Sequence, residues 1–256
     1  MKKKAKIAVC SAFQNGHEVI SFIAEQPHKI EFVATCKKDD SEYEEEIAKI
    51  CKEKGIKVFR KTDANDKKFI EQLRDSSIDI VIMAWWPDII KSDAIRAVNI
   101  GWLNMHPSLL PHGRGKHAYY WSVVEGSPFG VSLHFIDEGV DTGRVLFQRP
   151  IEIDITDTGE SLYRKGSCEV VALFKRSYEK IINLDFKAVG QDNSKATSHM
   201  AQDIEAHSTI DLSKKYKASD LINILRGRTF FSGESAYFFL NGKKYYARVS
   251  IEKAKE

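Results

Sequence analysis

Residues 78–111 read IDIVIMAWWPDIIKSDAIRAVNIGWLNMHPSLLP and contain the pattern that decides the fold. Residues 78–84 form a nearly continuous apolar run, broken only by Asp79, and residues 100–106 form a second strand-like run. Strands that are apolar on both faces are typical of buried parallel sheets. A helical pattern over residues 87–98 separates the two runs, so this stretch predicts a β-α-β unit.

Strand and helix patterns alternate on both sides of this unit. The predicted strands cover residues 6–10, 30–36, 56–59, 131–136 and 144–153, and the predicted helices cover residues 17–24, 39–51, 67–74, 118–124 and 160–183. Pro150 cannot donate a ladder hydrogen bond, so the last strand is expected at an edge. The alternation predicts an α/β fold with a Rossmann-like, mostly parallel sheet and helices on both faces.

The pattern changes after residue 186. Residues 190–207 are polar and aperiodic, which favours a linker or an extended arm. Ser219 is expected to cap a helix through Leu225, and Asn241-Gly242 between two aromatic-rich runs predicts a β-hairpin. We therefore expect a catalytic domain at residues 1–186, a linker or arm at 187–210, and a small C-terminal unit of helix and hairpin at 211–256.

Composition narrows the class of protein. Hydrophobic residues make up 43% and charged residues 29%, with 39 Lys and Arg against 36 Asp and Glu, so a dedicated nucleic-acid binder is not indicated. The start, MKKKAKIAVCSAF, is unlike a signal peptide, and no run reaches the roughly 18 apolar residues of a membrane span. We expect a cytoplasmic protein without membrane or nucleic-acid partners. The four cysteines show neither paired spacing nor CxxC, which argues against disulfides and a metal site: Cys10, Cys36, Cys51 and Cys168.

Asn104 and His106 are the first candidates for chemistry. Residues i and i+2 of a strand share a face, and these two stand at the carboxyl end of a predicted parallel strand, where α/β sheets bind ligands. Asp141 lies in a glycine-flanked loop after the next strand, DEGVDTG, which can bring a carboxylate towards the imidazole. From residue types and spacing alone, a structural, a metal-binding and a catalytic role all remain open.

Together these side chains suit acyl transfer to an amine. The amide of Asn104 can stabilise an oxyanion, worth on the order of a few kcal/mol, and His106 can take the proton of the amine. Asp141 would orient His106 and favour its protonated form. A serine hydrolase is not favoured, because Ser108 lacks the Gly-x-Ser-x-Gly turn.

The stretch NMHPSLLP at residues 104–111 and several residues after it resemble the folate-dependent formyltransferase family. The matching residues are Arg114-Gly115, Trp121, Gly130-Val131, His134, Asp137 and Asp141-Thr142-Gly143. The resemblance is strong over residues 78–150 and implies that Asn104, His106 and Asp141 are catalytic and that 10-formyltetrahydrofolate is the donor. We expect folate to contact Ala84, Trp85, Trp86, Gly139 and Val140, and the acceptor to contact Ser108, Leu109, Arg114, Gly115 and Trp121.

Within this family the sequence looks most like the nucleotide-sugar N-formyltransferases. The purine-synthesis branch usually has a glycine- and serine-rich phosphate loop after the first strand, whereas SAFQNG at residues 11–16 has one glycine. Methionyl-tRNA formyltransferases usually end in a larger barrel, and the segment after Gly190 looks like that of the sugar enzymes. We expect a nucleotide-linked 3- or 4-amino deoxysugar as acceptor, its diphosphate meeting Arg114, Lys116 or Arg226.

Two other functions are kept as alternatives. A methionyl-tRNA formyltransferase would need a continuous basic surface. A non-catalytic module would have no need for Asn104, His106 and Asp141 together. The Tyr245-Tyr246 pair of the hairpin suits the apolar face of a small sheet or a dimer contact, and stacking on a base is the third alternative.

Overall fold

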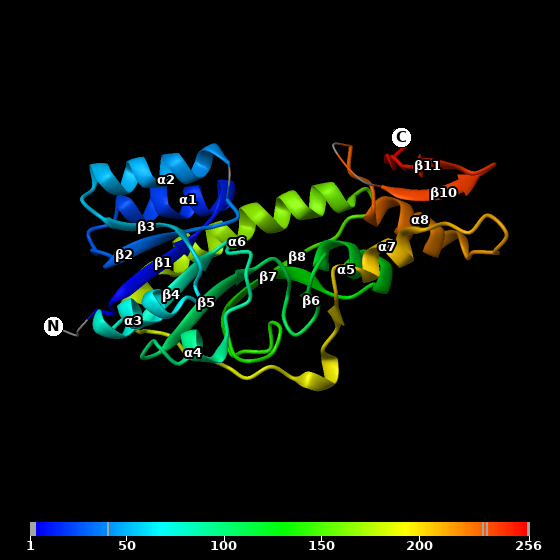
Figure 1. Cartoon of the computed structure of the whole chain (residues 1–256). Helices are drawn as coiled ribbons and strands as arrows, with labels where there is room; N and C mark the ends of the chain where they lie inside the picture. Colours follow the sequence, from blue (N-terminus) through cyan, green and yellow to red (C-terminus); the bar gives the residue numbers. More distant parts are fainter. Residues whose placement is uncertain (1–3, 40, 232, 234, 255–256) are drawn as a thin grey trace. The chain divides into compact units, whose positions relative to one another are not determined.

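The structure, a computed structural model, describes residues 4–39, 41–231, 233 and 235–254; the basic start at Met1 to Lys3 and Asp40 lie outside these. It confirms the α/β fold. A seven-stranded sheet has the order β3-β2-β1-β4-β5-β7-β8, which puts the strand with Pro150 at an edge as predicted (Figure 1). Its strands are β1 (Ile7–Ser11), β2 (Phe32–Cys36), β3 (Lys57–Thr62), β4 (Ile80–Ala84), β5 (Gly101–His106), β7 (Phe129–Phe135) and β8 (Val145–Ile151).

Strand pairing explains the apolar runs of the sequence. The pairs β3-β2, β2-β1, β1-β4 and β4-β5 are all parallel. Every residue of β1 and β4 is buried, because helices cover both faces. The register sets Met83 beside Asn104, so the carboxyl ends of β4 and β5 come together at one edge.

The helices form two layers around this sheet. In Figure 1, α1 (Phe13–Ala24) and α2 (Glu42–Glu53) lie on one face, with α3 (Lys67–Asp75) and α4 (Ser92–Ile95) on the other. Each turns an apolar stripe to the sheet, such as Phe69, Ile70 and Leu73 of α3. These residues join Phe32 in the hydrophobic core, where the rings of Phe32 and Phe69 meet edge to face.

The predicted helix over residues 87–98 is wrong in its first half, since α4 covers only four residues. The side chain of Asn65 holds residues 89–91 in another conformation. Its Nδ2 donates to the carbonyl of Ile89 at 2.9 Å, and its Oδ1 accepts from the amide of Lys91 at 2.7 Å. These bonds replace those of a helical turn and leave the side chain of Ile89 79% exposed.

Contacts within the chain divide it into two compact units. Unit 1 comprises Met1–His106, Leu133–Phe147 and Val170–Gln191, and unit 2 comprises Pro107–Ser132, Gln148–Glu169 and Asp192–Glu256. Strands β7 and β8 and helix α6 (Gly159–Ile182) contribute residues to both. The domain boundaries expected at residues 186 and 210 stay a prediction.

The polar segment after α6 has more structure than its composition predicts. It contains η1 (Asn193–Lys195), β9 (Ser198–His199) and α7 (Asp203–Ser208). Within unit 2, β9 pairs in parallel with β6 (Arg114–Gly115), and Trp121 stacks on the His199 ring at 3.7 Å between centroids. Trp121 belongs to α5 (Ala118–Glu125). The residues that make these contacts are far apart in the sequence, so the local polarity of the segment could not predict its structure.

The C-terminal helix and hairpin are present. Helix α8 (Ala218–Gly227) packs against α5, and its N-cap is Lys217, so the expected cap at Ser219 is wrong: that residue lies inside the first turn. Strands β10 (Ala236–Leu240) and β11 (Lys243–Ala247) form an antiparallel pair around Asn241-Gly242. Both turn residues have positive φ, 50° and 75°, as a two-residue hairpin turn requires.

Candidate active site

The structure brings the three predicted catalytic residues together in unit 1. Asn104 and His106 lie two residues apart at the carboxyl end of β5. The loop after β7 carries Asp141, whose Oδ2 lies 3.6 Å from Nε2 of His106. That distance exceeds a hydrogen bond but is short enough for strong electrostatic attraction once the imidazole is charged. The side chains of His106 and Asp141 are 9% and 15% exposed, so solvent screens the pair only weakly.

His134, which the predicted catalytic set left out, contacts both Asn104 and Asp141. Its side chain is 1% exposed, its Nε2 lies 3.5 Å from Oδ1 of Asp141, and the same nitrogen lies 3.2 Å from Nδ2 of Asn104. Nδ1 lies 2.8 Å from the carbonyl oxygen of Phe135, which can only accept, so this nitrogen carries a proton. With the ring neutral, Nε2 accepts a hydrogen bond from the Asn104 amide. His134 therefore orients Asn104, and the signal for this was its place on the strand beside β5.

The loop that carries Asp141 is held in a tight conformation. Asp141 has φ of 53°, in the left-handed region that is uncommon for residues with a side chain. Oδ1 of Asp137 accepts bonds from the amide of Gly139 at 3.1 Å and from the hydroxyl of Thr142 at 2.5 Å. At Gly143 the backbone passes so close to the Phe135 carbonyl that a Cβ would lie 1.9 Å from its oxygen. The glycine and aspartate pattern of the sequence follows from these constraints.

The expected folate contacts also lie in unit 1. Ala84 ends β4, and its carbonyl accepts the amide of Ala12 at 3.0 Å. The chain then turns at Trp85, with φ of 58°, while Trp86 is buried and its Nε1 has no hydrogen-bond partner. Across the site, Gly139 and Val140 are exposed. An orphaned buried donor and an exposed apolar side chain fit a bound aromatic molecule with polar groups, so these residues stay the predicted folate contacts.

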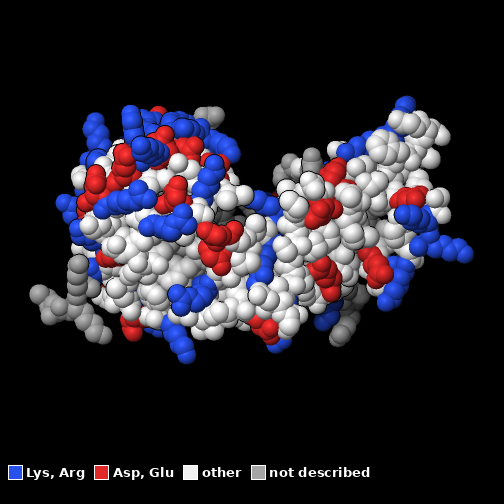
Figure 2. Space-filling model, turned by 60° about the horizontal axis from the view of Figure 1, so that its bottom comes forward, with Lys and Arg blue, Asp and Glu red and all other residues white. Residues whose placement is uncertain are grey.

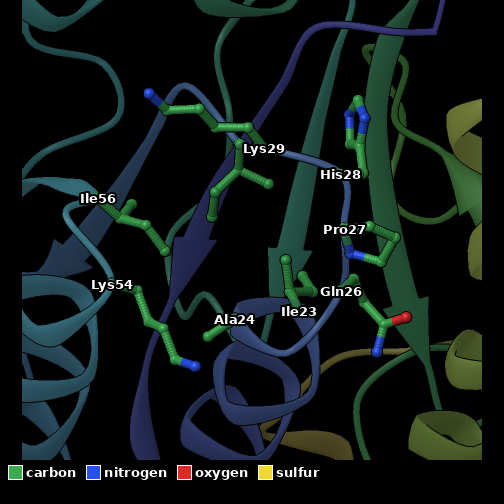
Figure 3. A pocket seen from close by; sticks show the side chains of 9 residues that line it. Ile23, Ala24, Gln26, Pro27, His28, Lys29, Lys54 and Ile56 are labelled. Atoms are coloured by element: carbon green, nitrogen blue, oxygen red, sulfur yellow. The ribbon is translucent and has the colours of Figure 1, made fainter.

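Two pockets of unit 1 lie at opposite ends of the strands. A shallow groove formed by residues 89–93 and Glu138 adjoins the loop with Gly139 and Val140, and Ser92 donates to Glu138 at 2.7 Å across it. The pocket in Figure 3 is lined by the turns before β2 and β3, including His28 and Lys54. It therefore lies at the amino-terminal edge of the strands, opposite the catalytic candidates.

In unit 2, the loop that follows His106 is fastened by hydrogen bonds. The hydroxyl of Ser132 donates to the carbonyl of Ser108 at 2.7 Å and accepts the amide of Leu110 at 3.1 Å. Gln148 donates to the carbonyl of Leu110 at 2.7 Å. Ser108 is buried, its hydroxyl has no partner, and Leu109 is partly exposed. Both stay predicted acceptor contacts on a rigid loop.

The other expected acceptor contacts are more buried than their residue types suggest. Arg114 is only 7% exposed, and its Nη2 donates to Oδ1 of Asn193 at 2.8 Å. A Cβ at Gly115 would lie 2.2 Å from the carbonyl oxygen of His199, so β9 covers this glycine. Trp121 is 6% exposed. Their roles as acceptor contacts stay predictions, whereas Lys116 is exposed.

Arg226 does not fit the phosphate-binding role that the sequence suggested. It is 7% exposed, and its Nη1 donates to the carbonyls of Asp154 and Asp157 at 3.0 and 3.2 Å. Its Nε donates to Oδ1 of Asn223 at 2.9 Å. Burial also lowers the pKa of Arg226. The guanidinium therefore joins α8 to the turn before α6 within unit 2.

Among the residues that the structure describes, no group of three or more His, Cys, Asp or Glu side chains is arranged to hold a metal ion. None of the helices described is both long and apolar enough to cross a bilayer.

The sheet thus presents a half-buried Asn104, the buried His106 and His134, and Asp141 near its carboxyl edge, where α/β folds bind their ligands. The chain belongs to the formyl transferase family, whose model matches residues 4–176. A second model, the N-formyltransferase dimerization C-terminal domain, matches residues 203–253.

The curated relatives fall into two groups. Methionyl-tRNA formyltransferase of Lachnospira eligens is 29% identical over 190 residues, 74% of this chain and 59% of that protein. GDP-perosamine N-formyltransferase of Brucella melitensis is 29% identical over 189 residues, 73% of this chain and 71% of that protein. The chain thus spans about 60% of the length of the methionyl-tRNA formyltransferases that it matches.

Solved structures share the fold. A 4-N formyltransferase from Francisella tularensis superposes with a TM-score of 0.81 at 22% identity, over 98% of this chain and 99% of that one. The N-formyltransferase of Helicobacter canadensis, solved in complex with folinic acid and dTDP-3-aminofucose, gives 0.71 at 22% identity, over 94% and 86%. The likeness therefore includes the C-terminal helix and hairpin as well as the sheet.

Proposed function

We propose that this chain transfers a formyl group from 10-formyltetrahydrofolate to the amine of a nucleotide-linked amino deoxysugar. The observation that carries the proposal is the nearly end-to-end likeness to a 4-N formyltransferase, over 98% of this chain, together with the likeness to the Helicobacter canadensis enzyme that was solved with dTDP-3-aminofucose. The N-formyltransferase C-terminal model at residues 203–253 supports the same reading. The Asn104, His106 and Asp141 cluster supplies the chemistry.

The three residues divide the work of the reaction. The acceptor amine attacks the formyl carbon, and the carbonyl oxygen takes up negative charge. The Nδ2 group of Asn104 has two N–H donors; one meets His134, and the other is left to stabilise that oxyanion. His106 takes the proton that the nitrogen must lose, and Asp141 stabilises the resulting imidazolium from 3.6 Å.

The second half of the reaction releases the folate and returns the proton. A carbon–nitrogen bond to the sugar forms, and the bond from the formyl carbon to the folate nitrogen breaks. The proton held by His106 goes to the departing nitrogen, so the products are a formamide and tetrahydrofolate. No covalent intermediate on the protein and no metal are needed.

The N-terminus of α1, directly after β1, does not favour the phosphate-bearing acceptor of the purine-synthesis enzymes. A helix N-terminus can hold a phosphate through its free amides. At the start of α1, Oδ2 of Asp39 accepts the amide of Phe13 at 2.6 Å, and Asp39 is completely buried. A carboxylate of the chain itself therefore fills the place that a substrate phosphate would need. Of the three cations expected to meet the nucleotide diphosphate, Lys116 is exposed, whereas Arg114 and Arg226 are buried.

Methionyl-tRNA is the second candidate acceptor, because enzymes acting on it are among the relatives by sequence. Binding of tRNA relies on a basic surface that tracks the phosphates. On the face seen in Figure 2, Lys and Arg side chains are interspersed with Asp and Glu. This mixture favours the sugar.

The hairpin supports a homodimer as the working form. Four of its large apolar side chains are between 43% and 58% exposed: Phe239, Leu240, Tyr245 and Tyr246. Exposed apolar clusters of this kind mark interaction sites. The family model over this region is a dimerization domain, so a second copy of the chain is the proposed partner.

The acceptor is tested by direct competition. The full-length protein is supplied with 10-formyltetrahydrofolate and, in separate reactions, with charged initiator tRNA or a panel of nucleotide-linked 3- and 4-amino deoxysugars, and the formamide is detected by mass spectrometry. A sugar should be formylated efficiently. Alanine at Asn104, His106 or Asp141 should each reduce the rate at least about a hundredfold in folded protein. Efficient formylation of tRNA alone would favour the second candidate.

A further inference from the structure

We propose that Gln191 is a positioning residue that holds the Asp141 loop in its catalytic conformation. The proposal rests on the proposed function, in which Asp141 stabilises the charged His106. Gln191 stands at the end of unit 1, fifty residues from Asp141, in a segment whose polar composition suggested a linker.

The contact is a double hydrogen bond from one amide group. Nε2 of Gln191 donates to the carbonyl oxygen of Asp141 at 2.8 Å and to that of Gly143 at 2.7 Å. Both distances are short for N–H···O bonds. The two acceptors flank Thr142, so one side chain fixes the direction of two peptide groups in the tightest part of the loop.

The loop needs such a support because its conformation is unfavourable by itself. Asp141 is in the left-handed region, which costs a residue with a side chain about 1 kcal/mol or more. In an extended backbone its carboxylate would leave the two histidine rings, since both contacts depend on the direction of the Cα–Cβ bond. The hydrogen bonds from Gln191 to the Asp141 and Gly143 carbonyls favour the left-handed conformation of Asp141 over an extended one.

The position of Gln191 is itself determined by backbone pairing. Val189 and Val145 exchange two backbone hydrogen bonds, each of 2.8 Å, as an isolated antiparallel bridge. Val145 starts β8 directly after the loop, so this bridge ties the segment to the sheet. Gln191 lies two residues beyond Val189 and reaches back over the loop. Its side chain bonds to the backbone on both sides of Thr142, so we expect its effect on the histidines to pass through Asp141.

The test uses two substitutions of Gln191 in the full-length protein. Gln191→Leu keeps the bulk and removes the donor, and Gln191→Glu puts an acceptor-only carboxylate against two carbonyls. Each should lower kcat by about tenfold to a hundredfold, since displacement of about 1 Å at a catalytic group has effects of this size. KM for the acceptor should stay within about twofold, because the proposed role of Gln191 is to hold the loop and not to bind substrate. Gln72→Glu is the matched control: Gln72 also donates an amide bond, to Ser76 at 2.7 Å, but lies on α3.

A double-mutant cycle shows whether Gln191 acts through Asp141. In an Asp141→Asn background, Gln191→Leu should change kcat by no more than about twofold, because the interaction it supports is already gone. A loss of the same size in both backgrounds would overturn the proposal. So would kcat within about twofold of the parent in both single Gln191 variants.

A second readout is independent of turnover. The imidazole of His106, assigned in NMR spectra by comparison with His106→Ala, should titrate at lower pH in Gln191→Leu, as it should in Asp141→Asn, because both weaken the nearby negative charge. An unmoved titration would reject the positioning role even if no acceptor is ever formylated. A moved titration in a protein that formylates nothing would leave the positioning role standing and reject the proposed function.

Discussion

Replacing Gly143 by alanine is the sharpest test of how the loop geometry controls catalysis. A Cβ at this position would lie 1.9 Å from the carbonyl oxygen and 2.8 Å from the carbonyl carbon of Phe135. Side-chain carbons practically never come within 3.0 Å of such atoms. Both groups are backbone, so no side-chain rotation can relieve the clash, and the separation must grow by at least about 1 Å.

The movement has two direct consequences at the site. The Phe135 carbonyl accepts the Nδ1–H of His134 at 2.8 Å, so pushing it away loosens the ring that orients Asn104. The loop carries Asp141 only two residues from the substitution. A shift of about 1 Å at catalytic groups lowers rates by about a hundredfold, so kcat for formyl transfer should fall by that order. We expect KM to change much less.

The assay compares Gly143→Ala with Gly190→Ala, where nothing lies within 4 Å of the added methyl group. Steady-state kinetics with 10-formyltetrahydrofolate and the accepted sugar would give kcat and KM, and circular dichroism would show that both variants fold. Gly190→Ala should keep kcat. Full activity in folded Gly143→Ala would refute the link between loop position and catalysis.

Three further results are expected. His134→Phe replaces the imidazole with a ring of similar size and removes two hydrogen bonds, so kcat should drop at least about tenfold. The free energy of unfolding, measured in urea, should fall by about 1–3 kcal/mol. An unchanged kcat would show that His134 does not position Asn104. A hydrogen bond from Arg60 lowers the pKa of buried Glu44 below its usual 4.5, so the pair stabilises the fold above pH 4.5, and this stabilisation is lost as the pH falls through the lowered pKa. Glu44→Gln should therefore unfold at a lower urea concentration than the parent at pH 7, and the difference between the two midpoints should narrow below pH 4.5. A difference that does not depend on pH would contradict this. Phe239→Lys places a charge on a side chain that is 58% exposed, so light scattering should show monomers, whereas an unchanged dimer would place the interface elsewhere.

The sequence predicted the sheet, the hairpin and the proximity of the three candidate residues because their signals are local. Apolar runs on both faces predicted β1 and β4, and both are completely buried. The two-residue spacing of Asn104 and His106 put them on one face of a strand end, which needs no knowledge of distant contacts. Asn241-Gly242 predicted the turn through its own backbone preferences.

What escaped the sequence depends on contacts between residues far apart in the chain. Only the folded sheet sets His134 beside Asn104, and only the bridge at Val189 brings Gln191 to the loop of Asp141. Arg114 is buried although it is charged, and Asn193, 79 residues later, accepts a hydrogen bond from its guanidinium. Periodicity reports which face of an element is apolar, but the free energy of a polar side chain depends on the partner that tertiary packing supplies. The sequence by itself therefore identified the candidate catalytic residues, and the tertiary structure identified the side chains that contact them.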